Sequence, residues 1–224
     1  MSTDSTAQVE SARLRNEQGN VHVLLDNGAA ENGVPIEAED LFTLARMLNA
    51  TEVVLPDTLG DAEATKREGF KAIQKGQRIN RTFDYMAVPQ GSTPSEWRRC
   101  LRAMLDWPVR SIGISKFLTG GIYPDRRIAL EHVPELLESE KEIHLLGASD
   151  LKEVVKINRV FPERIRGVDS AIASIYTIEG EYLSSGKPRP NVEMDFLDGA
   201  HLNPDLLATN KRFWIEKTTD SRLH

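Results

Sequence analysis

The stretch YMAVPQGSTPSEWRRCLRAMLDWPVRSIGIS, residues 85–115, decides the fold of this chain. It begins and ends with short apolar runs, Tyr85–Val88 and Ser111–Ile114, which are typical of buried strands. Between the two runs, apolar residues recur at helical spacing, at Trp97, Leu101, Met104 and Leu105. A strand, a helix and a second strand in this order form a right-handed βαβ unit, so the two strands are expected to be parallel.

The same stretch carries a start signal for its helix. Thr93 can cap the helix, Pro94 suits the first helical position, and Glu96 completes a capping box. A second capped helix is predicted to begin after Ser149. Helical spacing also occurs at Leu41, Leu44, Ala45 and Leu48.

Six apolar, β-branched runs along the chain predict six strands. They are Val21–Leu25, Glu52–Leu55, Tyr85–Val88, Ser111–Ile114, Ile143–Leu146 and Ile165–Val168. Strands that alternate with helices predict an α/β fold with a parallel sheet, either a closed (β/α) barrel or an open doubly wound sheet. Because neither GxGxxG nor GxxxxGK[ST] follows the first strand, a TIM-type barrel is favoured. A complete barrel of this type has eight strands, so this one could be incomplete.

Three regions are expected along the chain: a mobile polar arm over residues 1–20, a barrel domain over 21–175, and an irregular C-terminal extension over 176–224 that packs on the barrel or caps it. Within the extension, Tyr176–Leu183 and Arg212–Lys217 are interpreted as extra strands or as parts of a cap. The two missing strands could lie in the arm or the extension, come from a partner chain, or be absent. Open sheet edges invite pairing, so a homodimer or a homologous partner subunit is one expectation.

The composition predicts a globular protein without a membrane span. No stretch approaches the roughly 18 consecutive apolar residues that a spanning helix needs, and Met1–Gln18 has no apolar signal-peptide core, so we expect a cytoplasmic protein. The net charge of −6 argues against nucleic-acid binding through bulk electrostatics alone. Any phosphate contact therefore requires a local basic patch. The candidates for that patch are Arg126, Arg127, Lys187 and Arg189.

Metal and cofactor chemistry has little support in the sequence. The single cysteine, Cys100, excludes a zinc site built on several thiolates. The histidines show no HExxH motif and no paired spacing. His22 and His144 fall inside predicted strands, where we expect core or barrel-lining residues. No metal and no cofactor are therefore expected.

Acidic and amide side chains follow the predicted strands, where a barrel carries its active site. Asp26, Asp57 and Asp169 come at the ends of three runs, and Gln90 comes at the end of a fourth. A single strand-end Asp is usually a helix cap or a turn former, but three that meet at one mouth are difficult to explain in that way. Like charges gathered in a cleft raise one another's pKa values, which can separate a nucleophile from a general acid/base. We expect these four side chains to converge around one pocket.

Several segments, taken together, resemble the tRNA-guanine transglycosylases. In the order and near the spacing of that family's last six strand ends, they are LLDNGAAE, VVLPDTLGDAEAT, YMAVPQG, SIGISKF, IHLLGAS and RGVDSAIAS. They look closer still to the phage and bacterial branch that puts 7-deazaguanines into DNA, the DpdA group. The resemblance covers Val21–Ser174, roughly two thirds of the chain.

The resemblance implies a role for each residue of the expected pocket. Asp26 would be the general acid/base and Asp169 the nucleophile, so that guanine in DNA or tRNA is exchanged for a 7-deazaguanine base through a covalent glycosyl-aspartate. Asp57 would bind the guanine edge. Further contacts to the base would come from Gln90, Gly91, Gly113 and Ile114.

The chain also departs from that family. The family's usual zinc site of three Cys and one His has no counterpart, and its first two barrel strands are not recognisable. Two other functions therefore stay open. One is a catalytically silent barrel that pairs with an active homologue or serves as a scaffold. The other is a barrel lyase or aldolase that forms a Schiff base on Lys116.

Overall fold

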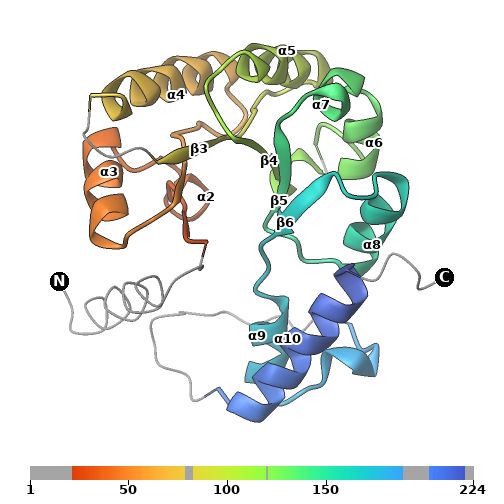
Figure 1. The fold of residues 1–224 in the computed structure, drawn as a ribbon. Coiled ribbons are helices and arrows are strands. Elements are labelled where there is room, and N and C mark those ends of the chain that lie inside the picture. The colour runs from red at the N-terminus through yellow and green to blue at the C-terminus, as the bar shows by residue number, and fades with distance from the viewer. Residues whose placement is uncertain (1–21, 79–82, 120, 189–201, 220–224) are drawn as a thin grey trace.

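The computed structural model describes residues 22–78, 83–119, 121–188 and 202–219, and within them six parallel strands form one curled sheet (Figure 1). The strands are β1 (Leu24–Leu25), β2 (Glu52–Val54), β3 (Asp84–Ala87), β4 (Ser111–Ser115), β5 (Glu142–Leu146) and β6 (Ile165–Val168). Each of them falls within or close to one of the predicted runs, although β1 is shorter than predicted. They lie side by side in chain order, with β1 at one edge and β6 at the other.

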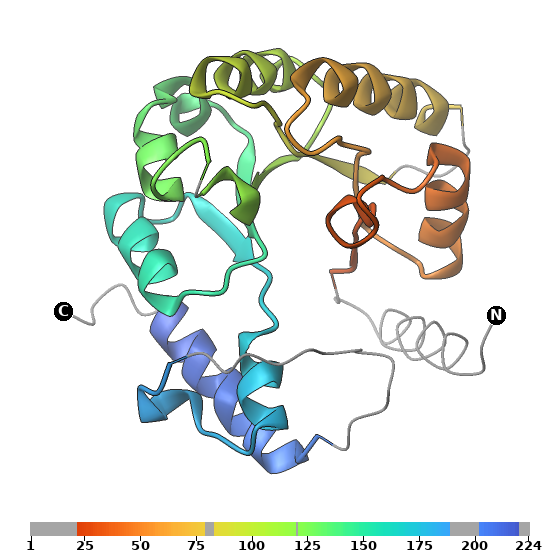
Figure 2. The same cartoon turned by 180° about the vertical axis from the view of Figure 1, so that it is seen from behind.

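This strand order distinguishes between the two architectures that the sequence leaves open. A doubly wound sheet reverses its direction of winding, so its later strands lie on the far side of the first one. Here every crossover advances in the same direction, and the longer connecting helices lie on the outer side of the curled sheet (Figures 1 and 2). The result is an α/β half-barrel. Within the described ranges, no further strand extends the sheet beyond β1 or β6.

The helices begin with a single short turn and end with a long C-terminal helix. They are α2 (Ala29–Asn32), α3 (Ala38–Met47), α4 (Ala62–Gly76), α5 (Pro94–Leu105), α6 (Arg126–Glu131), α7 (Pro134–Glu138), α8 (Leu151–Val160), α9 (Ile172–Ile178) and α10 (Pro204–Thr219), with 3₁₀ turns η1 (Lys116–Leu118) and η2 (Leu183–Ser185). In the described part of the chain, none of these helices is both long and apolar enough to cross a membrane.

The predicted helix caps are partly correct. Thr93 caps α5, because its Oγ1 accepts a 3.2 Å hydrogen bond from the N–H of Glu96. The Glu96 carboxylate accepts from the N–H of Ser92 at 3.0 Å and so closes the capping box one residue earlier than expected. The predicted cap at Ser149 is wrong. Asp150 caps α8 instead, since its carboxylate accepts the N–H of the second residue further on at 2.8 Å.

Alternate residues of the strands face two different cores. Ile112 and Ile114 of β4 are fully buried in the main core, between the sheet and its helices. Gly113, between them, faces the inside of the half-barrel, where a Cβ atom would lie 2.7 Å from Leu146. The inside holds a small apolar cluster formed by Val54, Met86, Val88, Leu24 and Leu146. The half-barrel is therefore filled by side chains rather than hollow.

At the amino ends of the strands, the inside of the half-barrel carries a charged layer. Glu52, the first residue of β2, is fully buried and accepts a 2.5 Å hydrogen bond from the hydroxyl of Ser111 in β4. Arg166 of β6 places its Nη1 atom 2.6 Å from Oε2 of Glu52. His22 Nε2 lies 2.9 Å from the same oxygen. Since β2 and β6 are separated by three strands, this layer joins distant parts of the sheet across its inner face.

The C-terminal extension is helical in its described part. The interpretation of Tyr176–Leu183 and Arg212–Lys217 as extra strands is wrong, because these residues belong to α9, η2, the turn between them and α10. The buried side chain of Asn210 in α10 gives the physical reason. It accepts from the N–H of Leu183 at 2.7 Å and donates to the hydroxyl of Thr177 at 3.1 Å, so helix packing satisfies these polar groups. The expected arm over residues 1–20 lies outside the described residues.

Candidate active site

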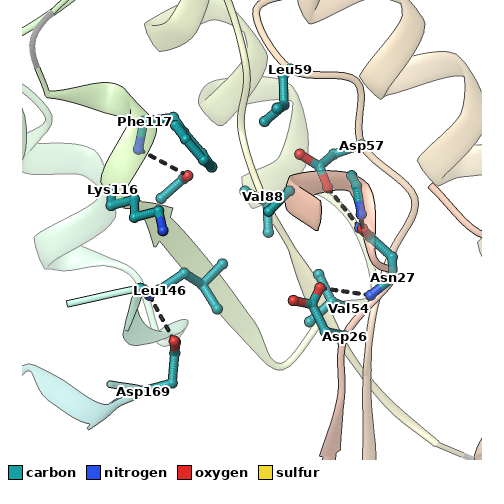
Figure 3. Close-up of a pocket in the computed structure, with 14 residues that line it drawn as sticks. Asp26, Asn27, Val54, Asp57, Leu59, Val88, Lys116, Phe117, Leu146 and Asp169 are labelled. Atoms are coloured by element: carbon teal, nitrogen blue, oxygen red, sulfur yellow. Dashed lines mark hydrogen bonds between the residues drawn. The ribbon is translucent and has the colours of Figure 1, made fainter. Parts of the chain in front are cut away.

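A pocket opens at the carboxyl ends of the strands (Figure 3). Its polar lining comes from four strand ends: Asp26 follows β1, Asp57 follows β2, Lys116 follows β4 and Asp169 follows β6. Asp26 and Asp57 lie on one side of the pocket, and Asp169 and Lys116 lie on the other (Figure 3). The apolar surface between the two sides is formed by Val54, Val88 and Leu146. The structure thus brings three of the four predicted polar residues to one mouth.

Asp57 is the buried acid of this pocket. Asn27 donates its side-chain amide to Oδ1 of Asp57 at 2.6 Å, and Gln90 donates to Oδ2 at 2.6 Å. Burial raises the pKa of Asp57 to about 6, and the negative charge of Asp26 adds to that rise, whereas the two amide hydrogen bonds oppose it. Two amides therefore fix the plane of a carboxyl group whose proton affinity is far above its ordinary value.

Asn27 is a site residue that the sequence does not single out. Its side chain is buried, donates to the carbonyl of Leu55 at 2.7 Å as well as to Asp57, and accepts from the N–H of Ala29 at 2.8 Å. Its own N–H donates to Oδ1 of Asp26 at 2.6 Å. The available signal is the Asn-Gly pair, because Gly28 has a φ of 73°, in the left-handed region that glycine adopts without strain.

Asp169 is the accessible acid of the pocket. Its side chain is 51% exposed, so the carboxylate can meet a ligand from solvent. Oδ2 accepts the N–H of Gly147 at 2.8 Å, and Oδ1 lies 3.2 Å from Nε2 of His144. The environment of Asp169 therefore contrasts with that of Asp57, and such a contrast lets carboxylates of one site take different chemical roles.

Lys116 and the rim of the pocket complete the site. The Lys116 ammonium lies 5.1 Å from the centre of the Phe117 ring, and the lysine stem passes over Gly147, where a Cβ atom would be 2.8 Å away. Phe117 and Leu59 both line the pocket and are exposed, 46% and 37% respectively. Because Lys116 is itself exposed, it lacks the apolar enclosure that activates a Schiff-base lysine.

The other predicted base contacts do not line this pocket. Gln90 donates to Asp57 and does not itself reach the pocket. Gly91 packs against the first turn of α5, where a Cβ atom would be 2.5 Å from the nitrogen of Trp97. Gly113 lies within the half-barrel against Leu146. Ile114 faces the main core, and its carbonyl accepts a 3.1 Å hydrogen bond from Arg126.

Of the four predicted phosphate-binding residues, Arg126 is not available to a phosphate. Arg126 is 1% exposed; its guanidinium pairs with Glu153 of α8 at 2.6 Å and donates to the carbonyl of Leu146 at 2.8 Å. Its assignment to phosphate is therefore wrong, because its donors are used inside the protein. Arg127 pairs with Glu131 of its own helix, and Lys187 pairs with Glu181. Arg189 lies outside the described residues.

Fold and site together define an α/β half-barrel with a carboxylate-lined pocket at the carboxyl ends of its strands. In the part of the chain that the structure describes, no three His, Cys, Asp or Glu side chains are grouped so that they could hold a metal ion. The chain matches no model of a known protein family and no curated protein sequence.

Proposed function

We propose that this chain is a transglycosylase that exchanges guanine in a nucleic acid for a 7-deazaguanine base through a covalent glycosyl-aspartate. The observation that carries the proposal is the meeting of Asp26, Asp57 and Asp169 in one pocket, with Asp26 and Asp169 on opposite sides (Figure 3). Base exchange with retained configuration needs a carboxylate that attacks the sugar and a second group that moves a proton to and from the base.

Asp169 supplies the nucleophile in this proposal. One of its oxygens bonds to C1′ of the nucleotide while the C1′–N9 bond to guanine breaks, and the electron pair of that bond leaves with the base. Asp26 donates a proton to the departing guanine. The incoming 7-deazaguanine then gives a proton to Asp26, and its ring nitrogen attacks C1′. This second attack releases Asp169 as a carboxylate and restores both residues.

Asp57 supplies recognition of the base. The Watson–Crick edge of guanine presents N–H donors, and a carboxylate matches them because it only accepts. Both oxygens of Asp57 are held by amide donors, Asn27 and Gln90, so the carboxylate has a fixed plane. Gln90 therefore acts on the base through Asp57 rather than by direct contact.

The apolar surface of the pocket favours an unstacked base, one that is flipped out of a duplex or lies in a single strand. Val54, Val88 and Leu146 offer apolar surface between the acidic sides, and Phe117 and Leu59 stand exposed at the rim. A base stacked in a duplex cannot reach such a site, so single-stranded, looped or flipped nucleotides are the expected substrates in DNA or tRNA.

The test is incorporation of labelled guanine, and then of 7-deazaguanine, into DNA and tRNA incubated separately with the full chain. Asp169→Asn and Asp169→Ala are expected to lower incorporation by at least about 1000-fold, as for loss of a covalent nucleophile, and to form no adduct on a denaturing gel. Thermal unfolding should change little, because the Asp169 side chain is half exposed.

Asp106→Asn is the matched control. Asp106 is an exposed aspartate at the end of α5 and does not line the pocket, so this variant should keep wild-type incorporation. If the wild-type chain incorporates no base into either nucleic acid, it is not a transglycosylase and the silent-scaffold alternative gains support. A substrate imine trapped by borohydride on Lys116 would instead support the lyase alternative.

A further inference from the structure

We propose that His144 is a positioning residue for Asp169, the nucleophile of the proposed function on which this inference rests. His144 lies in the middle of β5 between Ile143 and Leu145, which belong to the main core, so its side chain faces the inside of the half-barrel. Only 11% of that side chain is exposed, and Nε2 lies 3.2 Å from Oδ1 of Asp169.

The sheet leaves room for the imidazole in this position. The residues paired with His144 on the two neighbouring strands are both glycines, Gly113 of β4 and Gly167 of β6. A Cβ atom at Gly167 would lie 2.8 Å from Nδ1 and 3.1 Å from Cε1 of His144. The φ of Gly167 is not positive, so its backbone conformation does not by itself require glycine. Glycine is required at this position because the imidazole ring of His144 leaves no room for a Cβ atom.

Hydrogen-bond chemistry sets the direction of the contact. An ionised carboxylate can only accept, so Nε2 of His144 carries the hydrogen and donates to Oδ1. Since the N–H of Gly147 donates to Oδ2, both oxygens of Asp169 are held and the plane of the carboxylate is fixed. The free lone pairs can then face a sugar in the pocket.

This geometry predicts which kinetic quantity depends on His144. The imidazole moves no proton; it orients the carboxylate before attack and stabilises it again when the second step releases it. Base recognition depends on Asp57, across the pocket from Asp169 (Figure 3). Loss of the His144 donor should therefore lower kcat and the rate of adduct formation and leave the KM for the base unchanged.

The experiment compares four variants of the full chain in single-turnover adduct formation and in steady-state base exchange. His144→Leu should slow adduct formation on the order of 10- to 100-fold, the effect of one hydrogen bond to a charged group. His144→Gln, whose amide N–H reaches as far as Nε2, should restore most of that rate. Gly167→Ala, which displaces the ring without changing it, should also slow the reaction. Met86→Leu is the matched control, because Met86 is buried on the same inner face and lines the apolar cluster instead.

A second measurement does not depend on activity. The ¹⁵N signal of His144 Nε2, assigned with His144→Gln, should shift in Asp169→Asn if the hydrogen bond exists in solution. An unchanged signal would overturn the inference, and so would a His144→Leu rate equal to wild type or a His144→Gln rate as low as that of His144→Leu. Absence of any adduct with the wild-type chain would overturn the proposed function and the positioning role with it, while the ¹⁵N signal would still report whether the contact forms.

Discussion

The carboxyl group of Asp57 takes its unusual proton affinity from its surroundings. An aspartate in an unfolded chain is fully hydrated, whereas Asp57 is 5% exposed and lies near the negative charge of Asp26. Burial is the larger of the two causes that raise its pKa to about 6. The amides of Asn27 and Gln90 limit the rise by donating to the ionised form. A proton therefore binds the folded protein at Asp57 more tightly than it binds the unfolded chain.

This difference predicts how stability changes with pH. Because the pKa is raised on folding, the stabilisation from protonated Asp57 is present at low pH and is lost as the pH rises through about 6. Asp57→Asn cannot ionise. Its free energy of unfolding, measured with urea relative to wild type, should rise by about 2 kcal/mol from about pH 4 to about pH 7. A difference that stays constant over this range would show that Asp57 is not protonated more readily in the folded state.

At the scale of elements, one buried arginine attaches α6 to the sheet and to α8. The guanidinium of Arg126 pairs with Glu153 of α8 and donates to the carbonyls of Ile114 and Leu146, which lie at the ends of β4 and β5. A guanidinium has several donors in a fixed plane, so it can satisfy partners from three elements at once. The first residue of a short helix thereby becomes a central contact between helices and strands.

Removing the guanidinium of Arg126 should lower the free energy of unfolding. Arg126→Met leaves the Glu153 carboxylate without its partner and two carbonyls without donors, so the free energy of unfolding should fall by about 3 kcal/mol. Arg127→Met, at the neighbouring position, removes an ion pair within the helix and should change the free energy of unfolding by less than about 0.5 kcal/mol. Urea denaturation of both variants is the measurement. Equal effects would mean that the contacts of Arg126 contribute little.

Across the whole molecule, the charged layer inside the half-barrel joins strands that the sheet itself keeps apart. Arg166 of β6 meets Glu52 of β2 at 2.6 Å and Glu142 of β5 at 3.1 Å. Glu52 is fully buried, and its carboxylate is contacted by Arg166, by His22 and by the hydroxyl of Ser111. Within the described residues, the layer thus adds contacts across the inner face of the sheet to the packing of the helices on its outer face.

A double-mutant cycle tests this connection. Arg166→Met should lower the free energy of unfolding by about 3 kcal/mol, because it leaves Glu52 as a buried charge with fewer partners. Glu52→Gln combined with Arg166→Met should recover part of that loss, with a coupling energy above about 1 kcal/mol. Lys66→Met, which removes the surface pair with Glu63 on α4, is the control and should cost less than about 0.5 kcal/mol. Additive effects of the two core substitutions would show that the pair does not act as a unit.

Local signals were sufficient for the six strands and for the helices α3, α5 and α8, but they did not single out α4, α6 or α9. Thr93 and Pro94 act on the first turn of α5, and alternation or continuity of apolar residues over a few positions marks the strands. At Arg212–Lys217 the sequence left an extra strand and part of a cap as alternatives, and the strand alternative is wrong. Asn210 and its partners from α9 and η2 hold this segment in a helix.

The candidate site could be predicted only in part. Because the carboxyl ends of parallel strands meet at one edge, strand order was enough to expect Asp26, Asp57 and Asp169 near one another. The Asn-Gly pair marks Asn27 only as a turn residue; its contact with Asp57 could not be predicted, since Asp57 is 30 residues further along the chain. Arg126 follows a loop and resembles a surface residue in the sequence. Its side chain is buried because it pairs with Glu153 on another helix.

The sequence by itself determined the number and type of the strands, their parallel arrangement and the acidic character of their ends, because periodicity, caps and turns act over a few neighbouring residues. Only the tertiary structure decided that the sheet curls into a half-barrel, that Asp57 is buried while Asp169 is accessible, and that Arg126 lies inside. Burial, proton affinity and the convergence of side chains depend on contacts between residues distant in the chain, which exist only after the strands have paired and the helices have packed on them.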